Sequence, residues 1–309
     1  MWPKKVNWND LRFGVEIEFI GGKPEETALL PGWEMSLDEL QVDDTGLESG
    51  SELKPPPLRW AEREQIRLML GRLREQGSEM NWSCGLHVHV GIEPWGEAMV
   101  LPLLATALRT QDALRALMKT SKERLFYCPS VTEAMRADYA ANPRREALER
   151  AGRPQSHRCG INAAAWYDIG TVEIRLANGS LDYDEIVRTI ELCLRYVAAV
   201  GEGRDLPASA EELAAALGAT PDGYPPPIPV PRWHRERMWL EDALIPAVAG
   251  LAARLVPGGE LHNILPVEDG ILIAIEHESK MHRYVCRPPA TGWEVVRKVI
   301  DAPGTSQRP

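Results

Sequence analysis

Three short segments, far apart in the chain, alternate ionisable residues with aliphatic ones. Each segment contributes one pair of ionisable side chains two positions apart: Glu16 and Glu18, His87 and His89, and Glu173 and Arg175. Successive side chains of a β-strand point to opposite faces, so each pair shares one face while Val, Ile and Leu occupy the other. Acids and histidines that meet on one sheet face indicate a metal site, and the added arginine indicates a phosphate.

Two further acids could join this face. Glu52 follows a Gly-Ser pair on a short predicted strand, and Asp44 lies in a predicted turn. Like charges about 4 Å apart repel by roughly 1 to 4 kcal/mol per pair at surface-like dielectrics. Acids that converge would therefore need divalent cations, and carboxylate oxygens suit Mg²⁺ or Mn²⁺.

Each motif also has a simpler interpretation. A solvated edge strand can alternate acids with aliphatics, and Glu173 with Arg175 could form a cross-strand ion pair. The spacing of His87 and His89 fits zinc as well as magnesium. Two alternatives therefore stay open beside a phosphate-transfer enzyme: a zinc-dependent hydrolase that uses both histidines, and a non-catalytic relative that binds nucleotide or metal.

Basic and amide side chains between the motifs are candidate nucleotide contacts. Arg158 and Asn162 lie just before the Glu-x-Arg strand, and Lys122 and Arg124 open a polar segment, 120–158, rich in arginine. This segment could be a lid over the site or a solvated helical insert. With Arg175, these four residues are the expected cofactor-binding set.

The elements that must position the motifs follow from periodicity and turn signals. Strands are predicted at 11–20, 33–42, 51–54, 84–92 and 171–176, and helices at 60–76, 97–119 and 183–200. An Ala- and Pro-rich connector, 206–232, follows this region of 1–205. The extension 233–309 has no assigned role, with a helix near 232–255, a hairpin of 271–277 with 283–287 and a strand at 293–299. The fold class is α+β.

Composition narrows the class of protein. The chain has 309 residues, 44% hydrophobic and 26% charged, which is typical of a globular protein with a sizeable core. A formal charge of −10 argues against nonspecific nucleic-acid binding. No apolar run reaches the length of a membrane span, and the N-terminus lacks the apolar stretch of a signal peptide. We expect a cytoplasmic protein with no membrane partner, whose five scattered cysteines are reduced.

The ordered set of motifs resembles the amidoligase family of the glutamate–cysteine ligase / glutamine synthetase superfamily. The similarity covers about two-thirds of the chain, from 11 to 200. The pieces that carry it are 13–19 (Phe-Gly-Val-Glu-Ile-Glu-Phe), 44–56, 84–91 (Cys-Gly-Leu-His-Val-His-Val-Gly), 127–129, 158–162, 171–175 (Thr-Val-Glu-Ile-Arg) and 179–182.

The resemblance implies a curved antiparallel sheet, a half-barrel of glutamine synthetase-like type backed by helices, that binds ATP and two or three divalent ions. It implies as metal ligands Glu16, Glu18, Glu52, His87 and Glu173, with Asp44 as an addition. His89 is a further candidate, at a position where some members of the superfamily use another residue. Asp38 and Asp43 compete for the role of Asp44. Arg175 would contact the γ-phosphate, so that Arg175 and Glu173 form the catalytic pair.

The resemblance also implies the reaction, an ATP-dependent condensation of a carboxylate with an amine through an acyl phosphate. The substrates would be small molecules or peptides. Their identity and the oligomeric state, including a homo-oligomer, are left open by the sequence.

Overall fold

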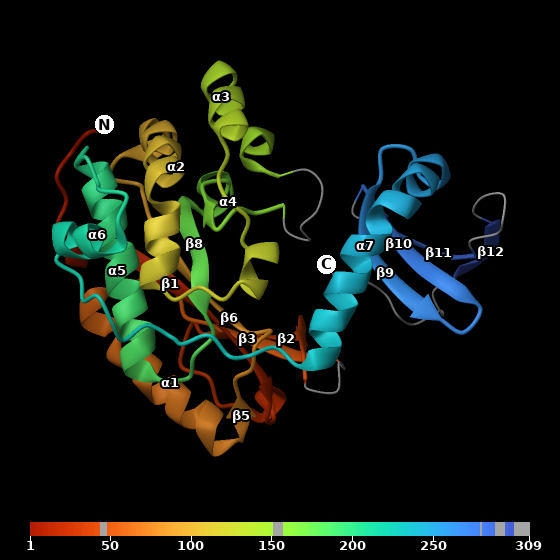
Figure 1. The fold of residues 1–309 in the computed structure, drawn as a ribbon. Helices are drawn as coiled ribbons and strands as arrows, with labels where there is room; N and C mark the ends of the chain where they lie inside the picture. Colours follow the sequence, from red (N-terminus) through yellow and green to blue (C-terminus); the bar gives the residue numbers. More distant parts are fainter. Residues whose placement is uncertain (44–47, 151–156, 279, 288–293, 300–309) are drawn as a thin grey trace. The chain divides into compact units, whose positions relative to one another are not determined.

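The computed structural model describes residues 1–43, 48–150, 157–278, 280–287 and 294–299 (Figure 1). The chain divides into two compact units. The first comprises Met1–Arg150 and Ser156–Pro229, and the second contains the chain from Val230 onward. Each unit has its own antiparallel sheet and its own hydrophobic core. The structure is thus a mixed α+β fold with open sheets.

The sheet of the first unit has eight strands, in the main order β2-β3-β1-β6-β8-β7, with β4 and β5 each paired to β1. The strands are β1 (Arg12–Gly21), β2 (Glu34–Val42), β3 (Glu48–Lys54), β4 (Leu58–Arg59), β5 (Ser78–Glu79), β6 (Gly85–Gly91), β7 (Ile161–Asn162) and β8 (Thr171–Asn178). All the pairings are antiparallel. The three strands predicted from the alternating motifs are therefore confirmed, and they are adjacent in the sheet.

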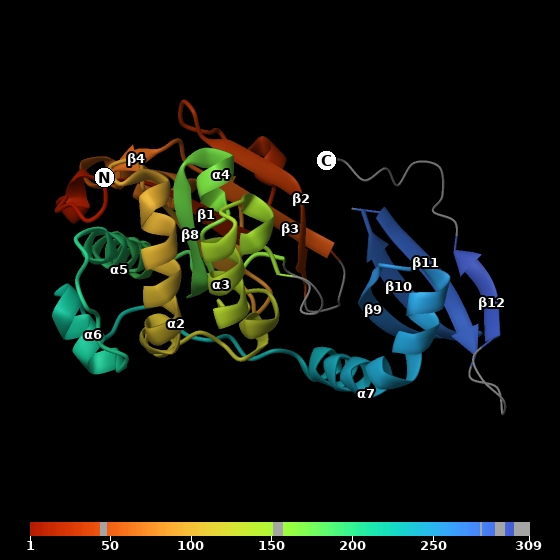
Figure 2. The ribbon, with the colours of Figure 1, turned by 90° about the horizontal axis from the view of Figure 1, so that it is seen from above.

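Helices pack on the aliphatic face of this sheet (Figure 2). They are α1 (Glu64–Glu75), α2 (Val100–Leu117), α3 (Glu133–Ala141), α4 (Ala165–Ile169), α5 (Tyr183–Gly201) and α6 (Ala210–Leu217), with 3-10 turns η1 (Trp8–Asp10), η2 (Pro24–Glu26), η3 (Trp60–Glu62), η4 (Gly96–Met99), η5 (Glu123–Phe126) and η6 (Arg145–Leu148). In β1 the odd positions from Phe13 to Phe19 are buried in the core, and the even positions Glu16 and Glu18 are only partly exposed on the other face. The helical layer thus fixes which face is ionic.

The arginine-rich segment 120–158 is packed against the first unit over its described part. Cys128, Met135, Tyr139 and Leu148 belong to the main core. Thr132 caps α3 by accepting a hydrogen bond from the backbone of Met135 at 3.2 Å. The described residues of this segment are therefore a folded insert, not a freely hinged lid.

The segment 206–232, predicted as a connector, contains a helix. Ser209 caps α6, and Leu213, Ala214 and Leu217 of this helix are buried in the main core. The alanine-rich stretch forms a short amphipathic helix, which ends at Gly218 in the αL conformation. The proline-rich stretch follows it.

The second unit has a helix and a four-stranded sheet, which is one strand more than the helix, hairpin and strand at 293–299 that were predicted. Its elements are α7 (Arg232–Leu255), β9 (Glu260–Val267), β10 (Gly270–His277), β11 (Lys280–Arg287) and β12 (Glu294–Val299), with the sheet order β12-β11-β10-β9. The predicted hairpin of β10 and β11 is present, but β9 was missed because Pro266 and several polar residues interrupt its alternation. Val248, Leu251, Ile264, Ile273 and Ile275 form the small core.

Two expectations concern the chain as a whole. Among the helices that the structure describes, none has the length and apolar character needed to cross a bilayer. All five cysteines are buried and free of disulfide bonds, as expected from their scattered spacing.

Candidate active site

Strand register brings the ionisable pairs together on one face of the first sheet. Glu16 of β1 lies opposite His87 of β6, and Glu18 lies opposite Glu52 of β3. On the other side of β6, His89 lies opposite Glu173 of β8. Residues directly opposite one another in an antiparallel pair have Cβ atoms about 5 Å apart, so four strands contribute one continuous ionic row.

An irregularity in β8 changes the direction in which the Arg175 side chain points. Between Val88 and Leu86 of β6 the pairing moves from Ile174 to Ala177, so β8 carries one extra residue opposite His87. Such a bulge bends a strand and redirects its side chains. As a result, an Nη1 of Arg175 contacts the carboxylate of Glu173 and lies 3.4 Å from His87 Nδ1.

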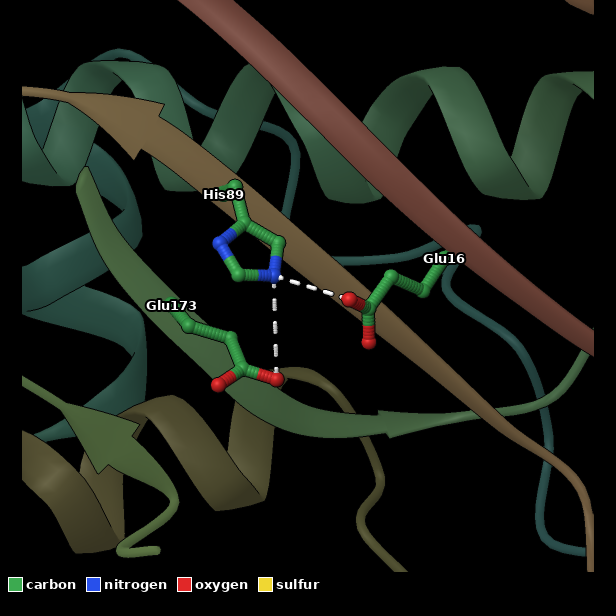
Figure 3. A group of neighbouring side chains, drawn as sticks. All are labelled: Glu16, His89 and Glu173. Atoms are coloured by element: carbon green, nitrogen blue, oxygen red, sulfur yellow. Dashed lines mark hydrogen bonds and ion pairs between the residues drawn. The ribbon is translucent and has the colours of Figure 1, made fainter. Parts of the chain in front are cut away.

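Glu16 lies at the centre of the group. Its Oε2 is 2.9 Å from His87 Nδ1, and its Oε1 is 3.2 Å from His89 Nε2. The same Nε2 atom of His89 is 3.8 Å from Glu173 Oε1. Figure 3 shows the ring of His89 facing the carboxylates of Glu16 and Glu173. Thr171 holds the other side of that ring, 3.0 Å from Nδ1. The two histidines and two acids therefore face one another across β1, β6 and β8.

The acids differ in their protonation chemistry. Burial opposes ionisation of Glu16, but hydrogen bonds with His87 and His89 outweigh it and hold the pKa of Glu16 below its usual value. For Glu52, burial and then the charge of Glu16 raise the pKa to about 8, although Lys54 contacts its carboxylate. The site thus holds one acid whose ionised form is disfavoured, which is where an added cation would be most stabilising.

Two arginines complete the site, Arg124, which is buried, and Arg175, which is partly buried. The side chain of Arg124, only 4% exposed, donates hydrogen bonds to the backbone oxygens of Cys84 and Arg175, both at 3.1 Å, and lies 3.4 Å from His87. A Cβ on Gly85 would collide with this guanidinium, so any larger residue there would displace the Arg124 side chain. In both Arg124 and Arg175 the buried Nε lacks a hydrogen-bond partner in the structure. Unmatched buried donors of this kind fit an anionic ligand such as a phosphate.

The donor set fits divalent metal. Two groups of potential ligand atoms lie within 4.8 Å of one another in the described chain: Glu16, His89 and Glu173, and Glu16, Glu52 and His87. Glu16 belongs to both groups, while the two histidines fall in different ones. A zinc site that uses both histidines together is therefore not among the groups found in the described residues.

The remaining predicted ligands and contacts have different places. Asp44 lies outside the described residues, as does the side chain of Asp38, whereas Asp43 is half-buried just after β2. Glu18 lies 3.6 Å from His87 Nε2 and accepts a hydrogen bond from the backbone of Gly85. Asn162 is buried and donates to Glu173 Oε2 at 2.7 Å.

The predicted nucleotide contacts thus divide into two kinds. Arg124 and Asn162 are buried among the site residues, whereas Lys122 and Arg158 are exposed on the surface. Sequence reasoning missed Lys54 and Thr171. The signal for Lys54 was available, because it stands two positions after Glu52 on the same predicted strand and so shares its face.

Comparison with known proteins agrees with this geometry. A family model described as "putative amidoligase enzyme" matches residues 9–197, a range that includes β1, β6 and β8. The chain belongs to this family. No curated protein gave a significant match. Family membership supports assignment of the protein as a ligase, and the matched range contains every described residue of the ionic row.

Proposed function

We propose that this amidoligase-family protein is an ATP-dependent carboxylate–amine ligase that acts through an acyl phosphate. The observation that carries the proposal is the meeting of four glutamates and two histidines on one sheet face, beside two arginines whose buried Nε donors are unmatched. A zinc-dependent hydrolase built on His87 and His89 would leave the paired glutamates and the arginines without a role. Direct condensation of a carboxylate with an amine in water is uphill, so the carboxylate must be activated.

The acids and histidines would hold Mg²⁺ or Mn²⁺ together with ATP. The proposed ligands are Glu16, Glu18, Glu52, His87, His89 and Glu173, with Asp44 as an addition. Divalent ions bound there would supply charge neutralisation and alignment at the β- and γ-phosphates. We further propose that the eight-stranded sheet corresponds to the half-barrel of the glutamine synthetase-like fold, with these ligands on its concave face.

Arg175 would stabilise the phosphoryl group as charge develops on it. Its side chain is 14% exposed and is held by Glu173, so its position is set before the substrate arrives. A fixed cation in a buried site stabilises charge more than one in water and needs no reorganisation. Asn162 would orient Glu173, and Arg124 would hold the backbone of Arg175. Lys122 and Arg158, both exposed, remain proposed contacts to the outer part of the nucleotide.

Calorimetry of ATP binding to metal-stripped protein, with and without Mg²⁺, tests the proposal. We expect binding that requires the metal and that Glu18→Gln removes, because Glu18 would be a ligand. If ATP does not bind and the purified protein retains zinc, the ligase function is refuted and the hydrolase is favoured. A second arm uses Arg175→Ala, which should abolish ATP turnover and leave a zinc-dependent hydrolysis little changed.

A further inference from the structure

One buried polar side chain near the site has no role in the ligand groups described above. Gln41 of β2 is 6% exposed, and its Oε1 is buried without a hydrogen-bond partner in the structure. A buried acceptor without a donor is destabilising, and buried polar groups in proteins are otherwise nearly always paired. The Oε1 atom of Gln41 can therefore accept a hydrogen bond from a ligand.

The backbone of β2 and β3 places this carboxamide on the ionic face. Gly50 precedes Glu52 by two residues on β3 with no register shift between them, so both point to the same face. A Cβ on Gly50 would collide with Gln41 Oε1 and would lie 2.8 Å from Gln41 Cβ. Glycine at this position thus makes the space that the amide occupies beside Glu52.

A bulge aims Gln41 at this space. Between Glu39 and Val42, β2 contains one more residue than the paired stretch of β3 from Gly50 to Glu48. Bulges of this kind are common next to active sites, where they redirect a side chain. The terminal torsion of glutamine is broad, so a small rotation can turn Oε1 toward a ligand.

The charges nearby favour a cationic donor. Glu18 lies opposite Glu52, and Glu39 interacts electrostatically with Lys54. Lys54 forms an ion pair with Glu52, so the negative charges of Glu18 and Glu39 remain to attract a cation. Gly50 lies about 6.5 Å along the strand from Glu52. The amide therefore lies one side-chain position along the ionic face from Glu52, beside Glu39, which is paired with Gly50.

We propose that Gln41 forms part of the binding site for the amine substrate and that its Oε1 accepts a hydrogen bond from a primary ammonium group. This assignment rests on the proposed ligase function, since only an amine-consuming reaction gives this contact a use. It makes Gln41 a residue that selects for N–H donors and against fully substituted ammonium ions.

Nuclear magnetic resonance of the full ¹⁵N-labelled chain tests the assignment. Methylammonium chloride is the probe, and tetramethylammonium chloride, which has the charge but no N–H, is the matched control at equal ionic strength. We expect methylammonium to shift the Gln41 side-chain amide and the Gly50 backbone amide to saturation. An equal response to tetramethylammonium would overturn the proposal.

Variants separate an acceptor from a donor at position 41, with the Gly50 amide as the common reporter. Gln41→Leu should weaken methylammonium binding by about tenfold or more, because a hydrogen bond to a charged group is lost. Gln41→Glu keeps the acceptor and should retain binding, and Gln76→Leu, outside the site, should match wild type. Equal losses in Gln41→Glu and Gln41→Leu would show that the site needs a donor and would refute the assignment.

Two further outcomes are decisive. If Gln41→Leu lowers Mg²⁺ affinity as much as methylammonium affinity, Gln41 is a metal ligand and the proposal fails. If Mg²⁺ and ATP do not bind to wild type in calorimetry, the ligase function fails whatever the methylammonium titration shows. A titration with no saturable shift refutes the role of Gln41 even where ATP binds.

Discussion

The two sheets of this protein carry similar strand patterns but differ in where their charged side chains meet. In the first sheet Glu16, His89 and Glu173 converge within 4.8 Å. In the second, β9 begins with Glu260-Leu261-His262, a short alternation of the same kind, yet the described residues of that sheet contain no comparable group. Alternation alone therefore predicts a strand and its faces, but not a site.

Burial is what separates the two sheets. The ion pair of Glu173 with Arg175 has side chains that are 1% and 14% exposed, whereas Asp269 and Arg297 in the second unit are 35% and 50% exposed. In the first sheet the helical layer fixes the aliphatic face, and side chains from the four adjacent strands β3, β1, β6 and β8 gather on the ionic face. Charges held there cannot spread into solvent, so they must be matched by partners or ligands.

The largest difference should appear in metal binding. Glu16→Gln removes the acid that belongs to both ligand groups, and we expect the affinity for Mg²⁺ to fall by about a hundredfold or more. The matched variant Glu276→Gln in the second sheet should bind as wild type does. Calorimetry with Mg²⁺ on both proteins measures this. If Glu16→Gln binds Mg²⁺ as wild type does, the metal does not bind at the ligand groups of the first sheet.

Ion pairs in the two sheets should differ in their contribution to stability. Arg175→Met leaves the charge of Glu173 buried without its cation, and we expect a loss of about 3 kcal/mol in the free energy of unfolding of the first unit. Arg297→Met in the second sheet should give no measurable change, because its partner is solvated. Urea unfolding followed by hydrogen exchange in β8 and β11 reports each unit.

A double variant controls for lost packing. Glu173→Gln combined with Arg175→Met removes the uncompensated charge and should recover part of the stability. A double variant as unstable as Arg175→Met alone would assign the loss to packing of the arginine side chain instead.

Metal should stabilise one unit only. At a Mg²⁺ concentration 100 times its dissociation constant, we expect the first unit to gain about 2.7 kcal/mol, because the ion binds the folded sheet and not the unfolded chain. Hydrogen exchange in β1 and β6 should slow accordingly, while β10 and β11 should not respond. Equal protection of both units would mean that Mg²⁺ acts through ionic strength and not through the site.

The smallest predicted effects concern two glycines. Gly85→Ala should destabilise the first unit by about 1 to 3 kcal/mol, because its Cβ would collide with Arg124. Gly250→Ala, on the exposed side of α7, should stabilise the second unit by about 0.5 to 1 kcal/mol through a lower cost of ordering the helix. Thermal unfolding of each variant shows whether its unit is stabilised or destabilised. A Gly85→Ala protein as stable as wild type would show that the Arg124 side chain can move.

Sequence reasoning succeeded where one residue pattern sufficed. The strands that carry Glu16, His87 and Glu173 were predicted from alternation and are confirmed. It failed at β9, where Pro266 breaks the pattern, and the predicted hairpin proved to be part of a four-stranded sheet. The predicted nucleotide contacts Asn162 and Arg124 lie among the site residues, where Asn162 donates a hydrogen bond to Glu173 and Arg124 donates to backbone oxygens, and their role toward a nucleotide stays a prediction.

The sequence by itself determined which side chains share a strand face, since the two-residue period of a β-strand is a local property of the backbone. It also determined the family, through motifs that keep their order along the chain. Only the tertiary structure decided that Glu16 meets both histidines, that a bulge turns Arg175 toward Glu173, and that Gln41 lies over Gly50. Register and bulges are set by pairing between strands distant in the chain, so no single segment of the sequence contains that information.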